Sequence, residues 1–334
     1  MSQLSSSQQP RLACTPALLP TLLGLLLLAL SGSALAERGP AVPDYPAEEV
    51  APDLFVIHGP TEYPTPENQG FMNNPAFLIT DEGVIVIDPG SSVQTGEMVL
   101  RQIRARTDKP LIAVLNTHVH GDHWLGNQAM RAANPAVPIY GHPRMLELVE
   151  QGAGEQWVTQ MLRATDGATR GTEPHGPNLA LGGGETLTLG GVAFRTHYFD
   201  QVHSTSDLMF ELPERQVLFL GDNACNQRIV RMDDGSFAGS IAALEAVREA
   251  AADATVLIPG HGPTGGWQIV DDYHRYLSGL YEGVTELYDE GLSDFEMKPA
   301  LAERLAEFSS WAGFDSELGR HISLAYLEAE AAAF

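Results

Sequence analysis

Three histidines and one aspartate lie within six residues of each other, at His118, His120, Asp122 and His123. They follow the apolar run 111–115, which predicts a buried strand. Neutral imidazole and carboxylate are ligands that zinc and similar borderline metals prefer. Ligands that are close in sequence also lose less conformational entropy when they gather around an ion. The stretch therefore predicts a metal site, in preference to a polar loop that is rich in histidine by chance.

Three further polar residues lie at the ends of predicted strands or in the loops just after them. His203 follows one strand-like stretch, Asp222 follows the apolar run 218–220, and His261 follows 256–258. The glycines beside Asp222 and His261 permit tight turns and a close backbone approach. A single histidine at a strand end is usually structural. Five histidines and two aspartates with the same placement instead favour convergence on one metal centre.

The remaining pattern alternates short strands with helices. The predicted strands are 54–57, 76–80, 84–87, 111–115, 137–140, 185–189, 192–198, 208–212, 217–220 and 255–258. The predicted helices are 93–106, 124–133, 143–164, 241–251 and nearly all of 267–334, with an exposed loop at 166–177. Two strand-rich blocks with interspersed helices predict an α/β (α+β) fold. We expect a four-layer αβ/βα sandwich of two mixed β-sheets with outer helices, plus a C-terminal helical extension.

The first 36 residues have the pattern of a secretory signal peptide. They contain one charged side chain, Arg11, then an apolar core at 17–30, and they end with Ala34-Leu35-Ala36. The apolar core is interrupted by a proline and is short for a membrane span, which needs roughly 20 residues. We therefore expect cleavage after Ala36, a periplasmic or secreted protein, and no membrane association after cleavage.

Four segments are predicted along the chain. They are a signal peptide at 1–36, an extended lead-in at 37–52, a metal-binding domain at 53–275 and a helical extension at 276–334. The chain has 19 basic and 43 acidic side chains, and this excess of acid argues against nucleic acid as a partner. A small-molecule substrate is expected instead. Only Cys225 follows the predicted cleavage site, so no disulfide is expected within the mature chain.

The ordered motifs resemble those of the metallo-β-lactamase-fold superfamily. The resemblance rests on HxHxDH at 118–123 and on the later motif positions His203, Asp222 and His261. Asp88, in Val-Ile-Asp-Pro-Gly, matches an aspartate that usually supports the metal loops. Val202 departs from the family, which usually has glycine before this histidine.

The resemblance implies two zinc ions per chain, with iron or manganese as alternatives. His118, His120 and His203 would hold the first ion. Asp122, His123 and His261 would hold the second, and Asp222 would bridge the two. True β-lactamases have cysteine or serine at the position of Asp222. In having an aspartate there, the chain resembles glyoxalase II-like thioesterases and lactonases. The surrounding pattern and Pro-Gly-His-Gly resemble exported zinc hydrolases associated with quinoprotein relay or sulfur oxidation.

The leading hypothesis is an exported dinuclear metal-dependent hydrolase. A metal-bridging hydroxide would attack an ester, thioester, lactone or amide-like bond, and Asp122 would accept the proton as the catalytic residue. One alternative is a mononuclear iron sulfur dioxygenase of persulfide type, which uses a similar fold. A further alternative is a metal-bound accessory protein without turnover. Metal analysis separates the first two hypotheses.

The other histidines are expected at the surface or in packing roles. They are His58, His142, His175, His197, His274 and His321. His175 lies in the glycine-rich loop 166–177, and the alternative for this residue is contact with a substrate if the loop overhangs the metal site.

Overall fold

The computed structural model describes residues 38–333, so the predicted signal peptide lies outside the described residues. The first sheet has the strand order β1-β2-β3-β4-β5-β6-β7, and its strands are β1 (Ala47–Ala51), β2 (Leu54–Ile57), β3 (Ala76–Ile79), β4 (Val84–Ile87), β5 (Leu111–Leu115), β6 (Ile139–Gly141) and β7 (Leu179–Ala180). The second has the order β12-β11-β10-β9-β8, and its strands are β8 (Thr186–Leu189), β9 (Val192–His197), β10 (Met209–Leu212), β11 (Val217–Gly221) and β12 (Val256–Pro259). Both sheets combine antiparallel and parallel pairs, so both are mixed.

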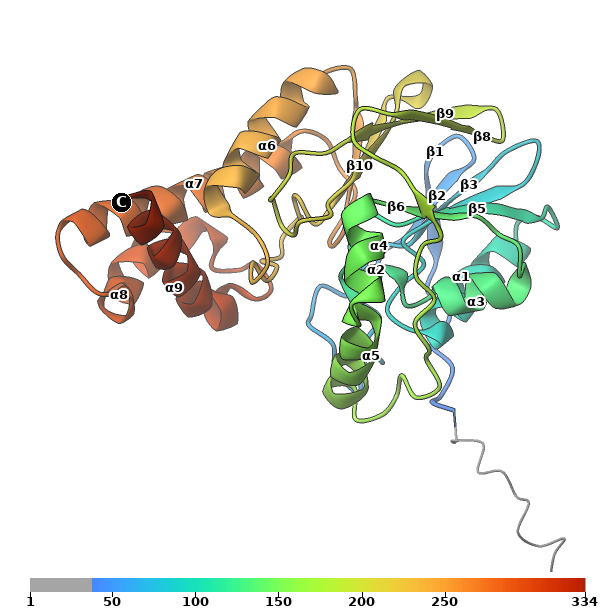
Figure 1. The fold of residues 1–334 in the computed structure, drawn as a ribbon, viewed down its shortest axis with the longest axis horizontal. Helices are drawn as coiled ribbons and strands as arrows, with labels where there is room; N and C mark the ends of the chain where they lie inside the picture. Colours follow the sequence, from blue (N-terminus) through green and yellow to red (C-terminus); the bar gives the residue numbers. More distant parts are fainter. Residues whose placement is uncertain (1–37, 334) are drawn as a thin grey trace, which may run out of the picture. The chain divides into compact units, whose positions relative to one another are not determined.

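The helices lie between and after these strands (Figure 1). They are α1 (Val93–Arg104), α2 (Gly121–Trp124), α3 (Asn127–Ala133), α4 (Pro143–Glu150), α5 (Ala153–Ala164), α6 (Phe237–Ala250), α7 (Gln268–Asp289), α8 (Asp294–Arg304) and α9 (Phe314–Ala332). Two short 3-10 helices occupy Pro213–Arg215 and Ala306–Phe308. Among residues 38–333, no helix combines the length and apolar character needed to cross a bilayer.

Three buried apolar clusters define the layers. One joins the two sheets, with side chains such as Ile87 and Leu115 from the first sheet against Phe210 and Phe219 from the second. Another packs α1 and α3 against the outer face of the first sheet, and a third packs α6 and the C-terminal helices against the second. This order of helix, sheet, sheet and helix confirms the predicted four-layer sandwich with a helical extension.

Local chemistry explains where the elements differ from the predicted ones. The predicted helix 143–164 is two helices, because Gly152 between them has a left-handed backbone with φ of +97°. Helix α6 begins four residues before the predicted start, where the Ser236 side chain accepts a hydrogen bond from the Gly239 amide. Within the predicted lead-in, Ala47–Ala51 form β1 and pair with β2. The alternation of this strand is obscured by neighbouring prolines and acidic residues.

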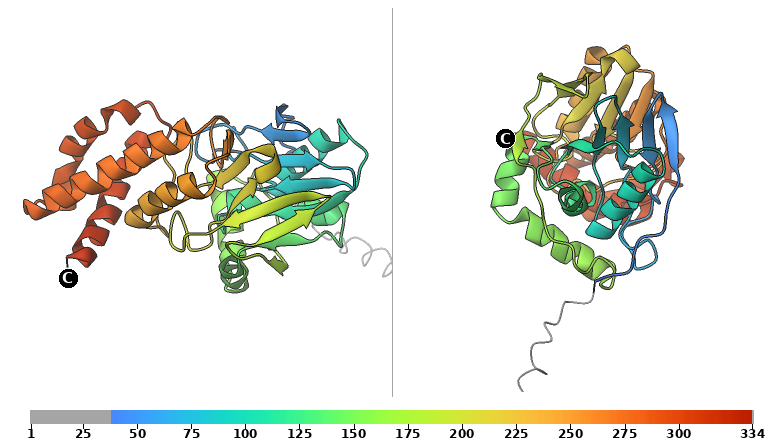
Figure 2. Two further views of the ribbon diagram at one scale, coloured as in Figure 1. Left: turned by 90° about the horizontal axis from the view of Figure 1, so that it is seen from above. Right: turned by 90° about the vertical axis from the view of Figure 1, so that its right-hand side faces the viewer.

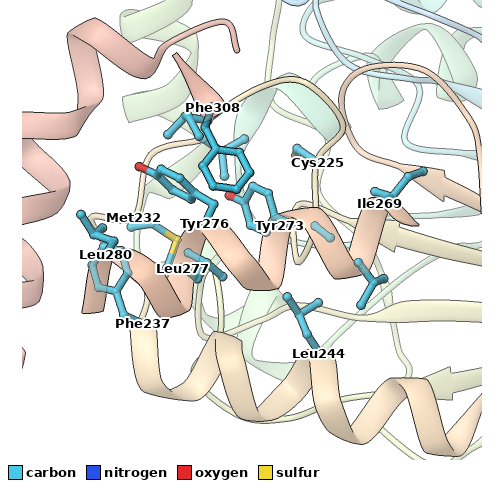
Figure 3. Close-up of a cluster of buried hydrophobic side chains, with 14 of the residues drawn as sticks. Cys225, Met232, Phe237, Leu244, Ile269, Tyr273, Tyr276, Leu277, Leu280 and Phe308 are labelled. Carbon is cyan, nitrogen blue, oxygen red and sulfur yellow. The ribbon is translucent and has the colours of Figure 1, made fainter. Parts of the chain in front are cut away.

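The C-terminal helices α7, α8 and α9 gather at one end of the described residues, beyond α6 (Figure 2). Figure 3 shows the apolar side of α7, where Tyr273, Tyr276, Leu277 and Leu280 are buried against residues such as Phe308. Their helical spacing predicts a packing role, and their burial confirms it. Helix α7 also joins the second sheet to α9 through this cluster.

His321 of α9 is buried in this region and links three segments. Its Nε2–H donates to the Val230 carbonyl at 2.8 Å, so Nδ1 accepts from the Tyr276 hydroxyl at 2.9 Å. Burial lowers the pKa of His321 to about 4. The fold therefore holds the neutral ring, as the predicted packing role requires.

We expect His321 to make the free energy of unfolding dependent on pH. The unfolded chain binds this proton near pH 6.5, whereas the folded chain binds it only near pH 4. Stability is therefore fully present above pH 6.5 and falls by about 3 kcal/mol as the pH drops to 4. Urea unfolding at several pH values, compared with a His321→Gln variant, checks this. Equal pH dependence in both proteins would contradict it.

Candidate metal centre

The seven predicted metal ligands meet in one place, although they come from both sheets. His118 and His120 lie in the loop after β5, and α2 carries Asp122 and His123. His203 lies in the loop between β9 and β10, Asp222 directly follows β11, and His261 lies after β12. All seven side chains are buried. The sandwich therefore gathers loops from β5, β9, β11 and β12 around one point.

The seven residues form two groups whose candidate ligand atoms lie within 4.8 Å of one another. His118, His120 and His203 form the first group, and Nε2 of His203 is 2.8 Å from Nδ1 of His120. Asp122, His123, Asp222 and His261 form the second group. Within it, Asp122 Oδ2 lies 3.2 Å from His261 Nε2 and 3.5 Å from His123 Nε2.

Asp222 lies between the two groups. Its Oδ2 atom is 3.5 Å from Nε2 of His203 in the first group and 3.3 Å from Nε2 of His261 in the second. Its Oδ1 atom is 3.2 Å from Nε2 of His123. Gly260 packs closely here, because a Cβ at that position would stand 2.0 Å from Asp222 Oδ1. This placement is the one that a carboxylate shared by two cations requires.

The chemistry of these residues fits divalent cations. The buried Nε2 atoms of His118 and His123 form no hydrogen bond among the described residues. Burial lowers the pKa of His118 and lowers that of His203 to about 3, so both rings are neutral. Burial raises the pKa of Asp222, but His261 and His123 outweigh this and bring it well below its ordinary value. Neutral imidazole and ionised carboxylate are the forms that bind metals.

The second ring nitrogen of four of these histidines has a partner. Nδ1 of His118 is 2.9 Å from Thr117 Oγ1, and Nδ1 of His261 is 2.8 Å from the Met72 carbonyl. Nε2 of His120 is 3.3 Å from Asp234 Oδ2. Such partners orient metal-ligating rings and raise their basicity.

Asp88 supports the metal loop from two sides, as the family resemblance implies. Its Oδ2 atom is 2.9 Å from Nδ1 of His123 and accepts from the Thr117 hydroxyl at 2.6 Å. Its Oδ1 atom accepts from the Thr117 amide at 2.9 Å. The backbone of Asp88 is left-handed, with φ of +47°, a conformation that costs energy in a residue with a side chain. The contacts with Thr117 and His123 hold it there.

A cavity of about 1090 Å³ opens onto the two groups. Five of the seven candidate ligands line it, namely His120, Asp122, His203, Asp222 and His261. The other lining residues come mainly from α5, from residues near Tyr63 and from segment 228–234. The wall combines apolar side chains, including Trp157, Met161 and Val230, with several charged ones. A ligand with an apolar body therefore fits beside the metal groups.

The loop 166–177 does not line this cavity, and His175 has the surface role that is expected of it. The lining residues from this region belong to α5 and not to the loop. The loop is tied instead to α1, since Thr172 Oγ1 accepts from the Val93 amide at 3.2 Å and Gln94 Nε2 donates to the Arg170 carbonyl at 2.8 Å. The His175 side chain is 39% exposed, and its Nε2 atom lies 4.0 Å from the exposed carboxylate of Glu173.

The remaining histidines lie outside both groups. His197 is bound to Glu211 at 2.8 Å, His58 to Thr264 at 2.9 Å, and His142 stacks on Tyr198. Cys225 is buried and 3.8 Å from Asp222 Oδ1, but it belongs to neither group. These placements agree with the packing or surface roles expected from the sequence.

Three site residues escape prediction from the sequence. Asp234 lies in an Asp-Asp-Gly turn, so its sequence context indicates only a turn. Trp157 lies on α5 with its ring 5.0 Å from that of His120, and its position resembles that of any amphipathic helix residue. Arg228 lies in an irregular segment after β11 and lines the cavity. No local pattern identifies any of them.

The chain belongs to the metallo-beta-lactamase superfamily, because the sequence model of that family matches residues 69–261, more than half of the chain. A probable metallo-hydrolase of Streptococcus pyogenes is 39% identical over 67 residues, which are 20% of this chain and 27% of that protein. A linear primary-alkylsulfatase of Pseudomonas sp. is 26% identical over 271 residues, 69% of this chain and 50% of that protein. The chain thus spans half or less of these two relatives.

A third relative, a probable hydroxyacylglutathione hydrolase of Schizosaccharomyces pombe, is 26% identical over 203 residues, 59% of this chain and 67% of that protein. Among solved structures, a metallo-beta-lactamase from Pontibacter korlensis has a TM-score of 0.57 at 17% identity, and covers 70% of this chain and 98% of that one. A sec-alkylsulfatase from Pseudomonas sp. has a TM-score of 0.67 at 18% identity, and covers 85% of this chain and 50% of that one. These structures confirm the fold.

Proposed function

We propose that this protein is an exported hydrolase that holds two divalent cations, with zinc as the expected metal. The position of Asp222 carries the proposal, because its carboxylate faces His203 of one group and His261 of the other. Export follows from the predicted signal peptide at 1–36.

Each of the two ligand groups would bind one cation. His118, His120 and His203 would hold one cation, Asp122, His123 and His261 the other, and Asp222 both. Two bound cations supply a nucleophile near neutral pH and polarise the oxygen of the bond that is attacked. Partners such as Asp88 and Asp234 keep His123 and His120 oriented, so little reorganisation is needed during the reaction.

Asp122 is the proposed proton acceptor. It belongs to the second ligand group, beside His261 and His123, and it also lines the cavity where a substrate would bind. A carboxylate in this place accepts the proton released when water attacks the substrate, and can later pass it to the leaving group.

The proposed substrate is a small molecule with an ester, thioester, lactone or amide-like bond. The cavity is large enough for such a molecule and is partly apolar. Two relatives carry the names of hydrolases, an alkylsulfatase and a hydroxyacylglutathione hydrolase. These names support hydrolysis over the oxygen chemistry of a mononuclear iron dioxygenase.

Metal analysis and a substrate screen test the proposal together. We expect protein purified without added metal to contain close to two zinc ions per chain, since the ligands form two groups. We also expect turnover of at least one member of a panel of chromogenic esters, thioesters, lactones, alkyl sulfates and cephalosporins. One iron per chain with persulfide oxidation would support the dioxygenase. Two zinc ions without turnover across the panel would support an accessory role.

A further inference from the structure

Arg228 is a buried arginine in the wall of the cavity that contains the metal ligands. It is 2% exposed, and it lines this cavity together with Asp122, Asp222 and His261. We propose that Arg228 binds an oxyanion of the substrate, so that the substrates are anionic molecules with an apolar body. This inference deepens the proposed hydrolase function and rests on it, because the bound anion is a substrate only if the protein is a hydrolase. The binding of the anion itself is tested separately.

Arg228 has no acidic partner among residues 38–333. No carboxylate oxygen of these residues lies within 4.0 Å of its guanidinium, and its Nε atom is buried without a hydrogen bond. Nη1 donates to the Glu62 carbonyl at 3.3 Å, Nη2 approaches the Met72 sulfur at 3.4 Å, and the guanidinium lies 4.7 Å from the centre of the Tyr63 ring. These contacts leave several of its five N–H donors without a hydrogen bond, and its positive charge has no counterion among residues 38–333.

An unpaired buried charge is costly, and this chain has an abundance of acids with which to pair it. It contains 43 acidic against 19 basic side chains. The neighbouring Arg231 is bound to Asp233 at 2.9 Å, and other arginines such as Arg304 also have carboxylate partners. Arg228, by contrast, has no carboxylate of residues 38–333 within 4.0 Å, although Asp122 and Asp222 line the same cavity. A partner from outside the chain completes this position.

The chemistry of that partner follows from the guanidinium and the surrounding wall. The planar fork of arginine matches the oxygens of a carboxylate or a sulfate in a bidentate manner. Met72, Trp157 and Val230 line the same cavity and provide apolar contacts. The substrate would therefore carry a carboxylate or sulfate group and an apolar chain or ring. Which oxyanion it carries is decided by the two arms of the test.

Calorimetric titration of the metal-loaded protein provides the test, because it needs no turnover. One arm compares 4-phenylbutyrate with its neutral amide, and the other compares hexyl sulfate with hexanol. The variants are Arg228→Met, Arg228→Lys and the matched control Arg231→Met, whose arginine lines the same cavity but already has a carboxylate partner. Repeating the titrations after removal of the metals separates an anion held by Arg228 from one held by the cations.

We expect Arg228→Met to weaken binding of at least one anion about tenfold or more, since a charge-assisted bidentate contact is lost. The neutral probes should change less than about twofold, and Arg231→Met should leave both kinds of probe unchanged. Three results would overturn the inference. Arg228→Met weakens binding of the anion and of its neutral counterpart equally, or Arg231→Met weakens anion binding as much as Arg228→Met does. The third is a wild-type protein that binds neither anion more tightly than its neutral counterpart.

Two further outcomes are decisive. If Arg228→Met does not fold, Arg228→Lys still tests the planar fork: a several-fold loss for the anion alone supports the inference, and wild-type binding overturns it. If binding depends on Arg228 but no hydrolysis is found, the proposed hydrolase function fails while the anion site stands. Failure of the two ideas is therefore distinguishable.

Discussion

An Asp222→Ala variant is expected to lose at least about a thousandfold in turnover and to bind fewer than two metal ions. The residue faces both ligand groups, within 3.5 Å of His203 and 3.3 Å of His261. Its removal takes away the carboxylate that both cations would share. Lewis-acid stabilisation of the transition state by bound cations amounts to several kcal/mol, and each 1.36 kcal/mol is a factor of ten in rate.

Metal content by elemental analysis and turnover of the best substrate from the screen check this expectation. Glu155→Gln is the matched control, because Glu155 lines the same cavity but is exposed and belongs to neither ligand group. The control should keep two metals and its full rate. An Asp222→Ala variant that retained two tightly bound metals would contradict the shared role of this carboxylate.

Asp122→Asn is expected to lower turnover by about a hundredfold to ten-thousandfold, the range that general base catalysis contributes. An amide oxygen still coordinates a cation, but an amide does not accept the proton. The metal content should therefore change less than in Asp222→Ala, while the dependence of the rate on pH should lose its acidic limb. Rates across pH and metal analysis on the same samples measure both effects.

An Asp122→Asn variant with both metals and full turnover would show that Asp122 is not the base. The Glu155→Gln control applies here too, since it removes a charge from the cavity without touching the ligand groups. A rate loss in the control of the same size would indicate a general effect of charge in place of proton transfer at Asp122.

Helices and strands could be predicted from the sequence where an apolar pattern is clear and the residues on either side do not obscure it. The apolar runs of β4, β5, β11 and β12 are short and buried, and each was predicted within one or two residues. The break between α4 and α5 was missed because a glycine within a helical pattern does not reveal its own backbone conformation. The strand β1, which pairs with the adjacent β2, was missed because neighbouring prolines and acidic residues obscure its alternation.

The site residues likewise divide into those that a local pattern reveals and those that it does not. His118, His120, Asp122 and His123 are close in sequence, so their spacing alone indicates a metal site. The assignment of His203, Asp222 and His261 to two particular cations depended on the family resemblance. Asp234 and Arg228 were missed, because the residues they contact are far away in the chain. His120 and Asp234, for example, are 114 positions apart.

The amino-acid sequence by itself determined the class of fold, the ligand types and the approximate order of the strands that present them. These properties follow from local periodicity and from the chemistry of single side chains. Only the tertiary structure decided that Asp222 lies between the two ligand groups, that α5 and not the loop 166–177 forms the cavity wall, and that Arg228 is buried without a counterion. Such facts depend on distances between segments far apart in the chain, and no local pattern encodes those distances.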